Sequence, residues 1–288
     1  MSASSSDQVH RFIFDNNDIR GEIITLEQSY QQAIKNHPYP PAIQRLLGEF
    51  LAAATLLAGT LKFNGLLTLQ ARGSGALSTI MAECSHDKKL RAVATFNENT
   101  ELPDIGNLKT LLQDGVLTIT IDPEKGQRYQ GIVPLEQVEL ADCIAQYFEQ
   151  SEQLHTRFWI NSNGQKATGL MLQALPMQLS KSQEEYQDHW ETLTSLAHTI
   201  TPEEQFSLNH ETLLFRLFHE QETRVFEPES VTFQCTCSRE RCLRALSSID
   251  KNEVESALAE QGEIQMDCHF CLSVYRFKRE DLNTILGD

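Results

Sequence analysis

Four of the seven cysteines lie in two closely spaced pairs near the C-terminus. The first pair is Cys235-Thr236-Cys237, and the second is Cys268-His269-Phe270-Cys271. Two such pairs, separated by roughly thirty residues, can surround one tetrahedral ion, because each short loop turns two sulfurs toward the same point. The C-x-x-C spacing of the second pair is usual for zinc, whereas the C-x-C of the first is tighter. Together they predict one zinc ion held by Cys235, Cys237, Cys268 and Cys271.

Other interpretations of these cysteines stay open. A thioredoxin-like C-x-x-C places its first cysteine at the start of a helix after a strand, but Cys271 is followed by the alternating segment 272–277, which indicates a strand. His269 could ligate zinc, yet inside a C-x-x-C turn a histidine is more often a spacer. The metal could also be purely structural, in a module of an adaptor or assembly protein.

The remaining cysteines have apolar or helical surroundings. Cys84 and Cys143 lie among apolar neighbours and have no partner nearby in the sequence, so we expect small buried side chains. Cys242 lies five residues after Cys237, where the segment 238–246 is expected to begin a helix that turns its thiol away. We therefore expect Cys242 to be dispensable for the metal.

A zinc centre here would combine two kinds of chemistry. Zinc holds thiols as thiolates, which are the form that oxidants attack. Arg239, Arg241 and Arg244 lie close in sequence and could offset the negative charge of four thiolates, or could form an ordinary solvated helix face. Metal binding in small zinc modules contributes roughly 10 to 16 kcal/mol of apparent folding free energy. Oxidation of the ligands would therefore remove most of what folds this segment.

Charge argues against nucleic acid as a partner. The chain has 24 Lys and Arg against 40 Asp and Glu, a formal net charge of −16, whereas a protein that binds phosphates needs a basic face. The cysteine-bearing segment is acidic as well, because residues 229–288 hold 7 basic and 11 acidic side chains, a net of −4.

The sequence also indicates a compartment. Residues 1–10 show neither a basic region nor an apolar stretch typical of a signal peptide, so we expect a cytoplasmic protein. The longest apolar stretch, 46–61, carries Gly48, Glu49 and Gly59 and falls short of a membrane span. It is expected to be a buried core helix, and no membrane association is expected. Thiols in a reducing compartment bind metal or switch redox state more readily than they form stable disulfides.

The pattern along the chain predicts an α+β fold. Alternating apolar residues predict two early strands and later hairpins. Between them, Pro41 is expected to open a helix that runs to about Lys62. The segments expected as strands are 10–14, 19–25, 66–70, 116–121, 129–133 and the hairpin 158–175. Helical spacing is expected over 26–35 and 135–150, and Gly73-Ser74-Gly75 is expected to be a turn. No catalytic motif stands out, so an enzyme is not expected.

Three regions are predicted: a mixed α/β core at 1–180, a polar helical linker at 181–228 and the cysteine domain at 229–288. In the linker, Thr201-Pro202-Glu203-Glu204 is typical of a helix capping box. The segment 209–219 then gathers five apolar side chains, which is too many to stand in water. We expect it to dock on the core conditionally and to expose Leu213, Phe215 and Phe218 when it is released.

The cysteine motif, Phe233-Gln-Cys235-Thr-Cys237-Ser-Arg-Glu-Arg-Cys242 followed by Gly262-Glu-Ile-Gln-Met-Asp-Cys268-His-Phe-Cys271, resembles the zinc domain of the redox-regulated 33-kilodalton heat-shock chaperones of bacteria. Further segments extend the resemblance over most of the chain: His10-Arg-Phe12, Arg20-Gly-Glu22, His37-Pro-Tyr-Pro40, Leu61-Lys-Phe63, Arg128-Tyr-Gln-Gly131, Tyr147–Leu154 and Leu214–Glu220.

This resemblance implies a cytoplasmic, ATP-independent holdase that is inactive while reduced and zinc-bound. Oxidants would form the disulfides Cys235–Cys237 and Cys268–Cys271, release zinc and unfold the linker, so that the core captures unfolding proteins. It also implies a homodimer in the oxidised state and the later transfer of clients to ATP-dependent chaperones. The core at 1–180 would then bind substrate, and 229–288 would be the redox switch.

Overall fold

The structure is a computed structural model that describes residues 6–60, 64–180 and 182–286. It divides into two units, one ending at Phe233 and the other beginning at Gln234. Residues 182–233 thus belong to the first unit, and the division into three functional regions with boundaries at 181 and 229 stays a prediction. The expected α+β class is confirmed, because both units combine helices with sheets that are mainly antiparallel.

The first unit contains two sheets. Sheet A has the strand order β10-β1-β2-β9-β8, with β11 also paired to β1, and all its pairings are antiparallel. Its strands are β1 (Gln8–Phe14), β2 (Ile19–Leu26), β8 (Thr156–Ser162), β9 (Ala167–Ala174), β10 (Thr223–Val225) and β11 (Glu229–Ser230). The β8–β9 hairpin turns where the sequence predicts it, around Asn163 and Gly164.

Sheet B has the order β12-β5-β4-β3-β6-β7, in which only β12 runs parallel to its neighbour. Its strands are β3 (Gly65–Gly73), β4 (Leu77–Ser85), β5 (Lys89–Phe96), β6 (Gly115–Pro123), β7 (Tyr129–Pro134) and β12 (Thr232–Phe233). Gly73 to Gly75 joins β3 to β4 as the expected turn. The strands β4 and β5 were not predicted from the sequence.

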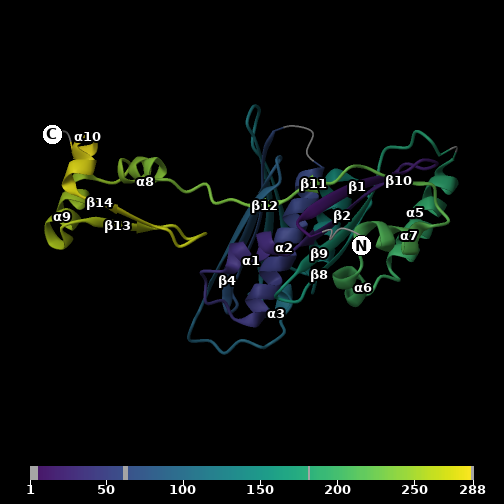
Figure 1. Ribbon diagram of the computed structural model, residues 1–288, viewed down its shortest axis with the longest axis horizontal. Helices are drawn as coiled ribbons and strands as arrows, with labels where there is room; N and C mark the ends of the chain where they lie inside the picture. The colour runs from purple at the N-terminus through teal and green to yellow at the C-terminus, as the bar shows by residue number, and fades with distance from the viewer. Residues whose placement is uncertain (1–5, 61–63, 181, 287–288) are drawn as a thin grey trace. The chain divides into compact units, whose positions relative to one another are not determined.

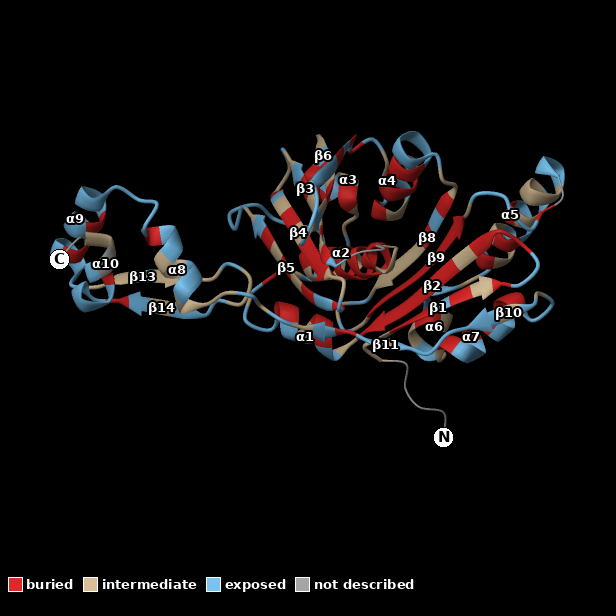
Figure 2. Ribbon diagram, turned by 90° about the horizontal axis from the view of Figure 1, so that it is seen from above, coloured by how far each residue is buried: buried red, intermediate tan, exposed pale blue. Residues whose placement is uncertain are grey.

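The helix α2 (Pro41–Gly59) lies between the two sheets and is buried along most of its length. Figure 2 shows it end-on, with sheet A on one side and sheet B on the other. Within the described residues it is the one helix that is long and apolar enough to cross a membrane by composition. However, 78% of its 18-residue apolar stretch is buried inside the fold. It begins at Pro41 as predicted but ends before Lys62, which lies outside the described residues with Leu61 and Phe63.

Shorter helices close the remaining sides of this core. They are α1 (Gln28–Ile34), α3 (Leu108–Leu112), α4 (Leu140–Tyr147) and the π-helical turn η1 (Phe148–Glu152). The helical spacing expected over 135–150 corresponds to α4 and η1, which bury Leu140, Ile144, Tyr147 and Phe148. The interior shared by these elements is one continuous apolar cluster.

Three helices cover the other face of sheet A: α5 (Gln183–Ala197), α6 (Pro202–Ser207) and α7 (His210–Phe218). In Figures 1 and 2 they follow β9 and lie across β1 and β2 from α2. The predicted capping box at the start of α6 is confirmed, because the side chains of Thr201 and Glu204 each bond the backbone of the other. As a result β2 and β9 are buried on both faces.

The second unit is small. It contains α8 (Arg239–Leu246), α9 (Lys251–Gln261), the hairpin of β13 (Ile264–Asp267) with β14 (Val274–Phe277), the 3-10 turn η2 (Arg279–Leu282) and α10 (Asn283–Leu286). Ser238 caps α8 by accepting the N–H of Arg241. The predicted helix over 238–246 and the predicted strand after Cys271 are both present.

Candidate functional site

The four predicted thiols come together in the second unit. The sulfurs of Cys235, Cys237, Cys268 and Cys271 all lie within 4.8 Å of one another. The Sγ atoms of Cys235 and Cys268 are 3.6 Å apart, and those of Cys237 and Cys271 are 3.4 Å apart. A tetrahedral ion with Zn–S bonds of about 2.3 Å needs sulfurs about 3.8 Å apart. The donor set and its spacing therefore fit zinc.

The β13–β14 hairpin positions the second pair of thiols. Cys268 follows β13 directly, and its backbone N–H donates to the carbonyl of Ser273 at 2.9 Å. The N–H of Leu272 donates back to the carbonyl of Cys268 at 2.8 Å. Leu272 has φ 58°, a left-handed conformation that an L-residue adopts at a cost. This tight turn brings the sulfur of Cys271 back beside that of Cys268.

The surroundings of the four thiols shift their pKa values in different directions. Burial raises the pKa of Cys235, Cys237 and Cys268. Burial opposes ionisation of Cys271 too, but hydrogen bonds from the side chain and backbone of Ser273 and from Cys237 outweigh it and lower its pKa to about 7. Cys271 can therefore ionise near neutral pH. A bound divalent cation would deprotonate the other three thiols.

Two residues that the sequence analysis missed contact the sulfurs. The hydroxyl of Tyr275 donates to Sγ of Cys237 at 3.1 Å, and Ser273 Oγ lies 3.2 Å from Sγ of Cys271. Both follow the second cysteine pair, and Tyr275 lies on β14. The alternation after Cys271 predicts a strand there, but not that a hydroxyl would reach a sulfur.

Two of the three arginines expected to offset the thiolate charge, Arg239 and Arg241, have other partners. The guanidinium of Arg239 pairs with Asp281 at 2.6 Å and lies over the Phe277 ring, 4.5 Å from its centroid. Arg241 donates to the hydroxyl of Thr236 at 2.6 Å, inside the first cysteine loop. Arg239 therefore ties α8 to the small apolar core, and only Arg241 contacts a loop that carries thiols.

The other sulfur and imidazole groups are placed as expected. Cys84 and Cys143 are fully buried in the first unit, and burial raises the pKa of Cys84 to about 12. Cys242 is outside the four-sulfur cluster and packs beside the small core of the second unit. His269 is exposed, in keeping with a spacer.

A second feature concerns the outer face of sheet A. Phe12 and Phe14 of β1 are buried there against Phe218 of α7, with ring centroids 6.0 and 5.2 Å away. The same apolar cluster unites strands and linker helices, and its members include Ile19, Ile23, Leu170, Leu172, Trp190, Leu193, Leu213, Leu214 and Leu217. Removing α5 to α7 would expose a continuous apolar surface.

The face of α7 differs from the expectation at one position. Leu213 and Phe218 are each 1% exposed, as predicted for a docked helix, but Phe215 is 71% exposed. One face of α7 follows the helical repeat and holds the buried positions 210, 213, 214, 217 and 218. Residue 215 falls on the opposite side of the helix. The expectation that Phe215 is buried until release is therefore wrong.

The comparisons with known proteins agree with these features. The family model of the Hsp33 protein matches residues 7–278. The 33 kDa chaperonin of Pseudomonas aeruginosa is 51% identical over 280 residues, covering 97% of this chain and 94% of that protein. The 33 kDa chaperonin of Azotobacter vinelandii is 48% identical with the same coverage.

A solved structure supports the fold. The crystal structure of the 33 kDa chaperonin of Thermotoga maritima superposes with a TM-score of 0.81 and covers 98% of each chain, at 24% sequence identity. At that identity the likeness concerns the fold alone. The matched family model and the curated relatives, each across nearly the whole length, show that the chain belongs to the Hsp33 family of chaperones.

Proposed function

We propose that this protein is a redox-regulated, ATP-independent holdase in which the four thiols control access to the covered face of sheet A. The observation that carries the proposal is that α5 to α7 bury an apolar sheet face in the same chain that holds a four-thiol cluster. In the reduced state Cys235, Cys237, Cys268 and Cys271 would hold one zinc ion. Zinc would supply thiolate character and folding free energy to the second unit.

Oxidation would dismantle this unit by consuming its ligands. For each pair of thiolates, two electrons pass to hydrogen peroxide and one S–S bond forms. The O–O bond breaks, and the uptake of two protons gives two waters. The resemblance to the family supports Cys235–Cys237 and Cys268–Cys271 as the disulfides. With the four sulfurs in disulfides, no thiolate remains to hold zinc.

A covalent connection supports the transmission of this change to the linker. Cys235 follows β12 after one residue, and β12 is a two-residue edge strand paired with β5. Before it, β11 and β10 pair with β1 over two and three residues and lead back to α7. Such short pairings are weak by themselves, so unfolding of the cysteine unit would remove a restraint on the chain that follows α7.

Clients would then bind to the uncovered face of sheet A and to the released linker, including Leu213, Phe215 and Phe218. Because Phe215 is exposed while α7 is docked, it could make a first contact with a client before release. A homodimer in the oxidised state, a cytoplasmic location and transfer of clients to ATP-dependent chaperones complete the proposal, and they rest on the family resemblance.

The test is light scattering of a heat-denaturing model protein in the presence of the full chain. The reduced chain should not suppress aggregation, and the peroxide-treated chain should. Leu217→Asp, which places a charge in the buried face of α7, should make the reduced chain active, whereas Phe215→Asp on the exposed face should not. Equal inactivity of the reduced Leu217→Asp chain, with α7 shown to be undocked, would exclude sheet A as the client surface.

A further inference from the structure

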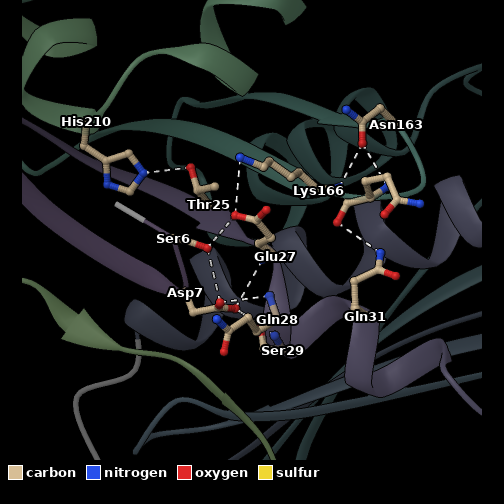
Figure 3. Close-up of polar contacts among 11 residues, drawn as sticks. Ser6, Asp7, Thr25, Glu27, Gln28, Ser29, Gln31, Asn163, Lys166 and His210 are labelled. Carbon is tan, nitrogen blue, oxygen red and sulfur yellow. Dashed lines mark hydrogen bonds and ion pairs between the residues drawn. The ribbon is translucent and has the colours of Figure 1, made fainter. Parts of the chain in front are cut away.

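A buried pair of histidines joins the linker to sheet A. The Nδ1 atoms of His10, on β1, and His210, the first residue of α7, are 2.8 Å apart, and the rings meet edge to face. The Nε2 atom of His210 lies 2.9 Å from Oγ1 of Thr25 on β2, as Figure 3 shows. The two histidines are 200 positions apart in the chain. Their contact therefore exists only while α7 is docked.

The contact between the two Nδ1 atoms requires at least one neutral ring. A neutral imidazole has one N–H and one bare nitrogen, so a bond between two Nδ1 atoms needs one donor and one acceptor. With both rings protonated, two N–H groups and two positive charges would face each other. His10 and His210 are only 7% and 1% exposed, and burial disfavours the charged form of an imidazole.

The charged groups that the structure describes around the pair do not reverse this preference. Burial lowers the pKa of His10, although Glu211 on α7 and Glu227 in the segment after β10 act to raise it. Burial, and then the charge of His10, lower the pKa of His210 to about 3.

The neighbouring strand and helix present neutral or already engaged groups. On β2 the neighbour of the pair is the hydroxyl of Thr25. On α6, Gln205 bonds Asn161 and the carbonyl of Trp159, and Glu204 is engaged by Arg216 and by the cap of its own helix. The other carboxylates of these elements lie elsewhere: Glu22 of β2 is beside Gly59 of α2, on the sheet face opposite to Thr25, and Glu203 of α6 is exposed.

We propose that the His10–His210 pair is an acid-sensitive latch, whose protonation undocks α7 and its neighbouring linker helices from sheet A without any oxidant. The undocking itself does not depend on the proposed function. Its consequence, an acid-activated chaperone, rests on the proposal that the covered face binds clients.

The direction of the effect follows from linkage. Once α7 is released, each histidine returns to its ordinary pKa of about 6.5. The released state then binds more protons than the docked state, so docking is strongest above that pH and weakens as the pH falls. For one histidine with a strongly lowered docked pKa, the ratio of undocked to docked chain should rise about tenfold between pH 7.5 and pH 5.5.

The experiment is hydrogen exchange of the reduced, metal-loaded full chain between those two pH values, corrected for intrinsic exchange rates. Amides of 183–218 should lose about tenfold in protection, while β4 and β5 keep theirs. The pH response should be lost in His210→Gln, which cannot titrate, and reduced in His10→Asn. His219→Gln is the matched control, because His219 lies at the end of the same helix with its side chain 54% exposed, and it should respond like the parent.

The slopes against pH are compared rather than the absolute levels, so a variant with weaker docking at neutral pH still tests the latch. Constant protection of 183–218 in the parent chain would overturn it. So would an undiminished acid response in both variants, or a response that appears only after metal is lost. If the helices undock in acid but no client binds, the latch stands and the proposed client face does not.

Discussion

The two units of the molecule bury apolar surface on very different scales. The first has a continuous core around α2, filled from both sheets, and a second cluster under the linker helices. Within its described residues, the second has five buried apolar side chains: Leu246, Val254, Leu258, Phe277 and Leu282. Domains of about 60 residues or fewer are marginal on apolar burial alone.

Because of this difference, the two units depend on their cysteines to different degrees. The first unit can fold without its cysteines ionising, since Cys84 and Cys143 behave as buried apolar side chains. The second places four thiols within 4.8 Å of one another, where a bound cation would offset the mutual repulsion of their thiolates. A chemical change at sulfur should therefore unfold one unit and spare the core of the other.

The largest expected effect comes from removing the metal. Chelation of the reduced, metal-loaded chain should unfold the second unit, because metal binding supplies roughly 10 to 16 kcal/mol in modules of this kind. The amides of α8, α9 and the β13–β14 hairpin should exchange fully, while those of α2 and sheet B stay protected. Hydrogen exchange followed by mass spectrometry measures both.

Substitution of one ligand should act like the chelator. Cys268→Ser should abolish stoichiometric metal binding, and Cys242→Ser should leave one metal per chain, since Cys242 lies outside the cluster. Retained metal in Cys268→Ser, or its complete loss in Cys242→Ser, would remove the basis of the comparison.

A matched pair of core truncations gives a smaller effect with two different readouts. Phe50 of α2 and Phe277 of β14 are both 0% exposed, and replacing a buried Phe by Ala costs about 3–5 kcal/mol. Phe50→Ala should lower the unfolding free energy of the first unit by that amount. Phe277→Ala should instead weaken metal affinity by about two to four orders of magnitude, because folding and binding are coupled there. Metal affinity unchanged in Phe277→Ala, by competition with a chromophoric chelator, would show that the small core folds alone.

The smallest predicted effect depends on pH and concerns the first unit only. Glu22 of β2 is buried beside Gly59, where an added Cβ would lie 2.0 Å from its Oε2. Neither of its oxygens has a hydrogen-bond partner in the described structure. Burial raises its pKa to about 7, although Lys88 and two arginines act to lower it.

A carboxyl whose pKa is raised on folding stabilises the folded state at low pH, where the carboxyl is protonated. This contribution is lost as the pH rises from about 4.5 to about 7. Glu22→Gln should therefore raise the unfolding free energy at pH 8 by up to about 3 kcal/mol and change little near pH 5. Urea unfolding at the two pH values measures it, with the exposed Glu98→Gln as control. A gain of equal size at both pH values would contradict the assignment of charge burial as the cause.

The sequence by itself determined the features that depend on local pattern. Alternation predicted β1, β2, β6, β7 and the β8–β9 hairpin, and Pro41 predicted the start of α2, because backbone geometry follows from neighbouring residues. The spacing of the cysteines likewise predicted which four sulfurs converge, since short loops leave them few other arrangements.

Tertiary structure alone decided which side chains meet across the chain. The helical repeat places Phe215 on the exposed face of α7. Arg239 pairs with Asp281 rather than with the thiolates. The contact of His10 with His210 joins residues 200 positions apart. No local pattern encodes such a contact, because it forms only when α7 docks on sheet A and both rings lose their water.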